Sequence, residues 1–330
     1  MSKTISLEDY NYHLPLDRIA QQAFHPRDHC KLMILKDNQI IHKKFYDIIN
    51  YLNKDDILVL NETKVQHCKL LGKKETGAKI EVTIVRNLGN NSYETRIKGG
   101  KLKEGHKLIF KHNKAIITKR NDDQFILQFT QPLYSKDLKI LTPPYIKKKV
   151  PEKDYQTVFA KTPGSLAAPT AGLHFTPQLL KKIQHKGIKI AYLQLDISFE
   201  TFLPVRDINH HKTGQEYFKL TKENADIINS NPINIIAVGT TVVKCLESCT
   251  WKNGNIQPTQ DYSQIFIKPG YQFKTPFKAM ITNFHLPKSS LLLLTATFTG
   301  KDRILDAYNQ ALQHNYRFFS LGDSMMICRE

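Results

Sequence analysis

The sequence predicts an α/β main domain interrupted by a small inserted all-β domain that is barrel-like. Three observations indicate this fold. The chain has 330 residues, which is long for one compact core and suits two domains. Strand and helix patterns alternate in its N-terminal and C-terminal parts, and only short β-rich runs lie between them. We therefore expect the main, catalytic domain at residues 1–62 and 150–330, and the inserted domain at residues 63–149.

The N-terminal part contains the first strand and helix patterns. Residues 32–35 and 39–41 predict two strands, and residues 45–52 predict a helix. Residues 56–60 are apolar enough for a buried strand that ends at Asn61.

The inserted region carries six short β-rich runs: CKLLGKK, AKIEVTIVRNL, SYETRIKGG, HKLIFKH, KAIITKR and QFILQF. Turn signals such as GNN, GGKLKEG and NDD separate them, and no helical periodicity lies between them. Six strands at this spacing favour a small barrel or sandwich. The sequence PPY at residues 143–145 and the charged KKKVPEKD after it indicate the exit from this region.

Strands and helices alternate again after residue 160. Thr176 is placed to cap a helix that has Pro177 at its first position and ends at Gly187. The remaining elements are predicted as strands at 189–195, 233–238 and 277–282, a helix after the turn at 239–241, an apolar helix from Ser289, and an amphipathic helix at 302–314.

The chain is strongly basic, with a formal net charge of +18 and a pI near 9.5. Such an excess attracts polyanions, of which nucleic acid is the commonest in a cytoplasm. Lys, Asn and Ile are abundant while Arg is scarce, so compositional drift in an AT-rich genome explains the same charge. Charge alone leaves both explanations open.

Composition also bounds the environment of the protein. No run of about eighteen apolar residues exists, so we expect no membrane span, and the N-terminus lacks the apolar region of a signal peptide. Five scattered cysteines fit a reducing compartment. No HExxH or paired CxxC pattern occurs, so we expect no metal. The expectation is a soluble, cytoplasmic monomer.

Two stretches place small or hydroxyl residues before a helix. GSLAAPTAGLHFTP, residues 164–177, lets a backbone approach a ligand closely and ends near His174, although a tight turn with a packed imidazole explains it equally well. AVGTT, residues 237–241, sits where a strand turns into a helix, a frequent place for a carboxylate or phosphate. A simple N-cap at Thr240 or Thr241 is the alternative.

Two further stretches combine polar and aromatic groups. TNFHLP, residues 282–287, ends a strand, and ligands of α/β sheets gather at the carboxyl ends of strands, which makes His285 a catalytic candidate. YRFFSLGDSMM, residues 316–326, joins Arg317 to three aromatic rings. That combination suits base stacking and phosphate contact, and core packing of the aromatic rings is the alternative.

Taken together, these stretches resemble the signature blocks of the S-adenosylmethionine:tRNA ribosyltransferase-isomerases, the queuosine biosynthesis family. The blocks are YQTVFAKTPGSLAAPTAGLHFT, FLPVR, AVGTT, TNFHLP and YRFFSLGDSMM, preceded by YHLPLDRIAQQ and LVLNETKV. The match is colinear from about residue 10 to residue 327.

The resemblance implies a reaction. Such enzymes move the ribosyl part of S-adenosylmethionine, their co-substrate, onto 7-aminomethyl-7-deazaguanine at the wobble position of tRNA. Adenine and methionine leave, the product is epoxyqueuosine-tRNA, and no metal is implied.

Residues matching the family blocks form the expected site. His285 or His174 would transfer a proton, and Asp323 would orient one of them or bind the ribose. Arg317 would hold a phosphate or the methionine carboxylate. The expected substrate-binding residues are Thr170, Gly172, Phe175, Thr240, Thr241, Asn283, Arg317 and Ser320.

Several positions depart from the family pattern. Where the family has LHVGxGTFxPV this chain has LDISFETFLPV, so Asp196 replaces a histidine, and Ser198 and Glu200 replace glycines. The other departures are Gly214 for a histidine, Val242 for a serine, Lys64, Lys69 and Lys244 for arginines, and His67 for a proline.

Three functions remain open at this point. Compensating changes could preserve the transferase. Alternatively, the chain is a diverged, non-catalytic tRNA-binding homologue on the same scaffold. A methyltransferase using the same co-substrate is the third reading, although no GxGxxG-like loop follows an early strand. The intact TAGLH, NFHLP and FFSxGD blocks favour the active transferase.

Overall fold

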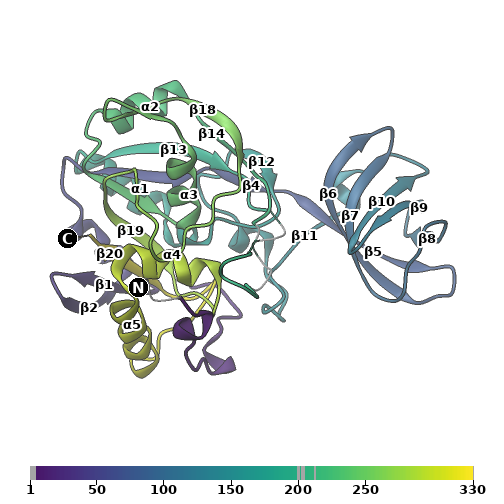
Figure 1. Ribbon diagram of the computed structural model, residues 1–330, viewed down its shortest axis with the longest axis horizontal. Coiled ribbons are helices and arrows are strands. Elements are labelled where there is room, and N and C mark those ends of the chain that lie inside the picture. The colour runs from purple at the N-terminus through teal and green to yellow at the C-terminus, as the bar shows by residue number, and fades with distance from the viewer. Residues whose placement is uncertain (1–4, 199–200, 202–204, 212, 330) are drawn as a thin grey trace. The chain divides into compact units, whose positions relative to one another are not determined.

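The computed structural model describes residues 5–198, 201, 205–211 and 213–329. It divides the chain into two compact units, one comprising Met1–Lys64 and Pro143–Glu330, and the other Val65–Thr142. The first unit contains a large mixed sheet with helices, and the second contains an antiparallel barrel (Figure 1). The predicted fold class, an α/β domain with an inserted barrel, is confirmed.

A nine-stranded sheet organises the first unit, in the order β18-β14-β13-β3-β15-β19-β20-β1-β2. The central strands β13, β3, β15 and β19 run parallel to one another, whereas β20 is antiparallel to β19. The strands are β1 (Lys31–Lys36), β2 (Gln39–Lys44), β3 (Ile57–Asn61), β13 (Lys189–Leu195), β14 (Glu216–Leu220), β15 (Ile235–Val238), β18 (Thr259–Ser263), β19 (Phe277–Asn283) and β20 (Ser324–Cys328).

Both faces of this sheet are buried, which explains why its central strands are apolar without a break. Ile57 and Val59 of β3 belong to the core that packs against α2, α3, α4 and α5. Leu58 and Leu60 point to the opposite core, which is covered by α1 and the 3₁₀ helix η4. Because successive strand residues face opposite sides, a two-sided core requires an apolar residue at every position.

The helices begin where the sequence signals predict. Thr176 Oγ1 accepts from the amide of Leu179 to cap α1, and Ser289 caps α4 in the same way. Residues 45–52, expected as a helix, form the 3₁₀ helix η4. The α-helices are α1 (Pro177–His185), α2 (Lys222–Asn229), α3 (Thr240–Ser248), α4 (Ser290–Thr299) and α5 (Lys301–Gln313). The 3₁₀ helices are η1 (Leu7–Tyr10), η2 (Leu16–Arg18), η3 (Arg27–His29), η4 (Phe45–Tyr51), η5 (Ser135–Asp137), η6 (Glu152–Tyr155) and η7 (Thr170–His174).

Val65–Thr142 form the barrel. Its six main strands pair antiparallel in the order β5-β6-β7-β10-β9-β8, and pairing between β5 and β8 closes the ring. They match the six β-rich runs of the sequence: β5 (His67–Lys74), β6 (Lys79–Gly89), β7 (Ser92–Lys98), β8 (Lys107–Phe110), β9 (Lys114–Asn121) and β10 (Gln124–Phe129). The short strand β11 (Lys139–Ile140) adds to β5.

Several elements have no counterpart in the sequence-based expectations. The most consequential are β14, β18, β20 and α2, because β14 and β20 bring distant side chains beside the central strands. The short strands β4 (Thr63–Val65) and β12 (Thr162–Ser165) pair with each other, as do β16 (Trp251–Lys252) and β17 (Asn255–Ile256).

Candidate active site

A cavity of about 330 Å³ opens at the carboxyl ends of β15 and β19 in the first unit. This is the edge of a parallel sheet where ligands bind, since strands end there and loops supply side chains. Six of the expected site residues line it: Thr170, Thr240, Thr241, Asn283, His285 and Ser320. The fold therefore brings together residues that lie up to 150 positions apart in the chain.

His285 lies in the wall of this cavity two residues after the end of β19. Its Nε2 is 2.9 Å from Thr282 Oγ1, and its backbone amide donates to Tyr308 Oη at 2.9 Å. Tyr12 Oη donates to its carbonyl oxygen. Burial lowers the pKa of His285 to about 3, so the imidazole is neutral near pH 7.

His174 lies behind the cavity and reaches it through a chain of hydrogen bonds. Thr170 Oγ1 donates to Asn283 Oδ1 at 2.9 Å, and Asn283 Nδ2 donates to His174 Nε2 at 3.0 Å. His174 Nδ1 then lies 3.2 Å from Cys30 Sγ. Burial, assisted by the charges of Arg317 and Arg27, lowers the pKa of His174 to about 3. His174 thus fixes the orientation of Asn283.

Four more of the expected residues, Gly172, Phe175, Asp323 and Arg317, lie outside the cavity lining. Gly172 allows close packing, because a Cβ there would come within 2.8 Å of the Phe159 ring. Phe175 is fully buried against Phe45. Asp323 accepts from the backbone amides of Lys31 and Arg317, each at 2.7 Å. Burial raises the pKa of Asp323, and the two amide bonds oppose that shift.

Arg317 is also engaged away from the cavity. Its guanidinium lies 3.8 Å from the centre of the Phe24 ring and donates to the carbonyl oxygens of Gln22 and Leu321. The turn that holds it requires Gly322, since a Cβ there would lie 2.4 Å from the carbonyl oxygen of Arg317. In this structure residues 317–323 form a tight turn that leads into the interior strand β20.

The start of α3 supplies a polar wall. Gly239 has φ +95°, a conformation that suits glycine, and no side chain caps the helix that follows. The first amides of a helix lack partners within it and carry a partial positive charge. Thr241 Oγ1 is buried without a hydrogen bond to any residue in the described part of the chain. This wall suits an anionic or strongly polar group of a ligand.

The cavity lining also contains residues outside the predicted set, among them Tyr145, Glu216 and Lys244. Tyr145 had been assigned only to the exit from the barrel, yet its Oη is 2.6 Å from Ser320 Oγ, and burial raises its pKa to about 12. Glu216 and Lys244 also line the cavity. The only sequence signal for Lys244 was that it replaces an arginine of the family pattern, and nothing in the spacing indicated that it meets Glu216.

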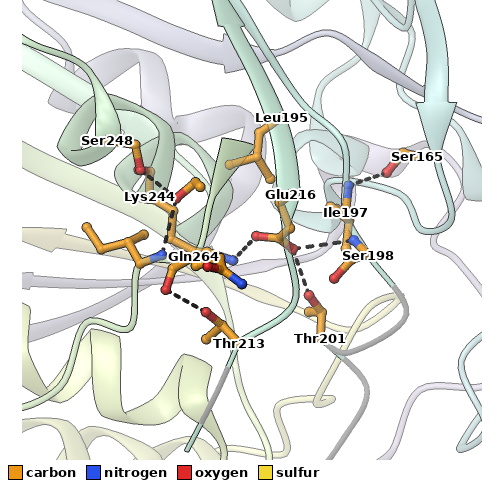
Figure 2. Close-up of polar contacts among 12 residues, drawn as sticks. Ser165, Leu195, Ile197, Ser198, Thr201, Thr213, Glu216, Lys244, Ser248 and Gln264 are labelled. Atoms are coloured by element: carbon orange, nitrogen blue, oxygen red, sulfur yellow. Dashed lines mark hydrogen bonds and ion pairs between the residues drawn. The ribbon is translucent and has the colours of Figure 1, made fainter. Parts of the chain in front are cut away.

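Glu216 and Lys244 form a buried ion pair, with side chains 3% and 12% exposed (Figure 2). Lys244 Nζ donates to Glu216 Oε2, and Thr201 Oγ1 donates to Glu216 Oε1 at 2.9 Å. The amide of Ser198 lies 3.4 Å from the same oxygen. The lysine that stands at the arginine position of the family pattern therefore has a carboxylate partner.

Other departures from the family pattern are also placed by the fold. Asp196 accepts hydrogen bonds from Thr63 Oγ1 at 2.5 Å and from Gln194 Nε2 at 3.0 Å. Burial is the largest effect on Asp196 and raises its pKa. Gly214 lines a small pocket next to the ion pair. Glu200 lies outside the described residues.

No group of three His, Cys, Asp or Glu side chains among the described residues is arranged to hold a metal ion. No helix in the same residues has the length and apolar character needed to cross a bilayer.

Comparison with known proteins gives three consistent findings. The family model described as queuosine biosynthesis protein matches residues 7–327. A protein of Sulfurihydrogenibium sp. (strain YO3AOP1), named S-adenosylmethionine:tRNA ribosyltransferase-isomerase, is 45% identical over 98% of this chain and 100% of its own length. The crystal structure of S-adenosylmethionine tRNA ribosyltransferase from Thermotoga maritima is similar with a TM-score of 0.57 and 33% identity, covering 97% of this chain and 99% of that one.

Proposed function

This chain belongs to the queuosine biosynthesis protein family of ribosyltransferase-isomerases, and on that premise we propose the full reaction it performs. The ribosyl part of S-adenosylmethionine is transferred to 7-aminomethyl-7-deazaguanine at the wobble position of tRNA and isomerised there. The products are epoxyqueuosine-tRNA, adenine and methionine. A cytoplasmic location and a monomeric state stay predictions.

The observation that carries this proposal is the cavity beyond β15 and β19. It combines a neutral histidine, an uncapped helix start and a buried pair of opposite charges. A molecule with an ionic amino-acid end, a polar sugar and a flat base matches such a mixture of groups. S-adenosylmethionine is such a molecule.

His285 is the residue to which we assign proton transfer. The sulfonium of the co-substrate acidifies the adjacent C5′ hydrogen, so a neutral imidazole in the cavity wall can start the reaction by taking that proton. The departing adenine needs a proton in return, and the protonated imidazole can supply it. The cavity must also exclude water from the reactive intermediates.

Other polar side chains of the cavity are held in fixed orientations by hydrogen bonds. Asn283 is held by Thr170 on one side and by His174 on the other, so its amide has one orientation. Ser320 is similarly tied to Tyr145. We assign substrate contacts to these fixed polar groups and to Thr240 and Thr241, because groups that are already oriented lose little freedom when a ligand binds.

The barrel supports tRNA as the second substrate. Its 78 residues, Val65–Thr142, carry 13 Lys and 3 Arg against 7 Asp and Glu, a net charge of +9 out of +18 for the chain. A groove of about 700 Å³ on the barrel is lined by Lys111, Lys136 and Lys139 and by Tyr134, which is 56% exposed. Basic grooves with an exposed ring suit a phosphate backbone and an unstacked base.

Replacing three groove lysines, Lys111→Ala, Lys136→Ala and Lys139→Ala, is expected to weaken tRNA binding about 100-fold or more at 0.1 M salt. The slope of log affinity against log salt should fall by about 2 to 3, since each lost phosphate contact removes roughly 0.7 to 0.9. Filter binding over a salt series measures both quantities. The affinity for S-adenosylmethionine should stay unchanged.

A matched control removes three exposed barrel lysines that do not line the groove, Lys98, Lys103 and Lys119. This control carries the same change in net charge and should cost clearly less affinity. Equal losses in the two triple variants would mean that only the overall charge matters and that the groove holds no RNA.

One assay tests the proposed reaction against its alternatives. Purified protein is incubated with labelled S-adenosylmethionine and tRNA that carries the deazaguanine precursor. Release of adenine and methionine in step with tRNA labelling supports the transferase. A shift in tRNA migration without turnover identifies a non-catalytic tRNA-binding homologue, and a methylated tRNA identifies a methyltransferase.

A further inference from the structure

The buried pair of Lys244 and Glu216 has no part in the proton transfer assigned to His285. Both side chains line the cavity beyond β15 and β19, and they are only 12% and 3% exposed. Taking two charges out of water costs about as much free energy as their attraction returns, so stability alone is a weak reason for such a pair. Their place in the cavity wall suggests that they meet a ligand.

The lysine side of the pair belongs to a surface that attracts anions. Lys244 follows Thr240 by four residues on α3, so the two lie on the same face of the helix. That face begins with the uncapped amides and with the free hydroxyl of Thr241. Lys244 Nζ has three protons and, among the described residues, donates one of them, to Glu216.

The glutamate side offers the complementary charge. Glu216 reaches the cavity from β14, and its Oε1 is held by Thr201 and by the amide of Ser198, so its carboxylate is fixed (Figure 2). A positive group in the cavity can join Lys244 as a partner of this carboxylate. Opposite charges a few ångströms apart match the two charged ends of a zwitterion.

The geometry points to this corner as the binding site for the amino-acid end of S-adenosylmethionine. Lys244 and the start of α3 bind the α-carboxylate, and Glu216 binds the α-ammonium. This assignment rests on the proposed function, because it takes S-adenosylmethionine as the molecule in the cavity. It replaces Arg317 as the residue for the carboxylate, since the guanidinium of Arg317 is engaged by Phe24 and two carbonyl oxygens outside the cavity.

Binding of two analogues tests each half of the assignment separately. Decarboxylated S-adenosylmethionine keeps the ammonium and lacks the carboxylate, whereas the 2-hydroxy analogue keeps the carboxylate and lacks the ammonium. Equilibrium dialysis with the full-length protein should show S-adenosylmethionine binding about 10- to 100-fold more tightly than either analogue, the range of a charge-assisted hydrogen bond.

Two substitutions should each abolish the preference for S-adenosylmethionine over one of the two analogues. Lys244→Gln should weaken S-adenosylmethionine about 10- to 100-fold and leave the decarboxylated analogue within about three-fold. Glu216→Gln should also weaken the binding of S-adenosylmethionine about 10- to 100-fold, and the affinity for the 2-hydroxy analogue should stay within about three-fold of wild type. The double variant Glu216→Gln/Lys244→Gln leaves no buried charge without a partner, so it tests both halves even where a single variant folds poorly.

A control variant separates this effect from a general loss of stability. Lys278→Gln breaks the ion pair with buried Asp56, which lies away from the cavity, and it should leave both discriminations unchanged. A double variant that still discriminates against both analogues overturns the assignment and leaves the proposed function intact. Wild-type protein that binds all three compounds equally also overturns the assignment and leaves the proposed function intact. Wild-type protein that binds none of the three overturns both the assignment and the proposed function.

Discussion

His285→Ala is expected to lower turnover by about 100-fold or more while leaving tRNA binding within a few-fold. Removal of the imidazole takes away the proton acceptor in the cavity wall, and it leaves the residues of the barrel unchanged. The backbone of His285 stays fixed, because its amide and carbonyl are bound by Tyr308 and Tyr12. Single-turnover release of adenine and a tRNA filter-binding assay measure the two outcomes.

The control for this prediction is His174→Gln. Gln can still accept from Asn283, and His174 lies outside the cavity lining, so turnover should fall much less than in His285→Ala. If His285→Ala retains turnover within about ten-fold of wild type, His285 is not the proton-transfer residue, because general acid–base catalysis contributes at least about 100-fold. If His174→Gln shows the larger loss, the two histidines exchange roles.

Acid is expected to destabilise the protein well above the pH at which ordinary carboxylates titrate. The pKa of His174 and of His285 is about 3 in the folded state, against roughly 6.5 when unfolded. Between these values the unfolded chain binds more protons than the native state, so stability falls as pH is lowered from 6.5 toward 3. At pH 5 the two histidines together cost about 4 kcal/mol of unfolding free energy relative to pH 7.5.

Urea unfolding at pH 7.5, 6, 5 and 4 measures this dependence. Burial raises the pKa values of Asp196 and Asp323. The native state therefore binds more protons at these two carboxyl groups than the unfolded chain does, so their contribution to the unfolding free energy rises as pH falls, opposite to that of the histidines. The double variant His174→Gln/His285→Gln should therefore lose little stability between pH 7.5 and 5. A double variant as acid-sensitive as wild type would place the cause of the sensitivity elsewhere.

The sequence predicted most of the local structure correctly. All six barrel strands, the cap at Thr176, the start of the apolar helix near Ser289 and the buried strand β3 lie where turn residues, the cap signal and apolar patterns placed them. These signals depend on backbone sterics and on neighbours within a few residues, which one stretch of sequence contains. The expected boundaries of the insertion, residues 63–149, stay a prediction.

The candidate site was predicted in part, for a reason that its residues illustrate. Thr240, Thr241 and His285 follow parallel strands and Asn283 is the last residue of one, and the strand-end rule puts such residues at one edge of the sheet. Arg317 could not be placed in this way, because its direction depends on how a turn at Gly322 folds back on the chain. A family block records which residues recur, and it does not record where each side chain points.

The sequence by itself determined the two kinds of fold, the order of the elements and the identity of the reaction family. Only the tertiary structure decided which charged groups meet. Glu216 and Lys244 are 28 residues apart, on a strand that no pattern predicted and on a helix whose face could not be known. Their contact follows from the order of strands in the sheet, which is set by the packing of the whole unit and not by any local stretch of residues.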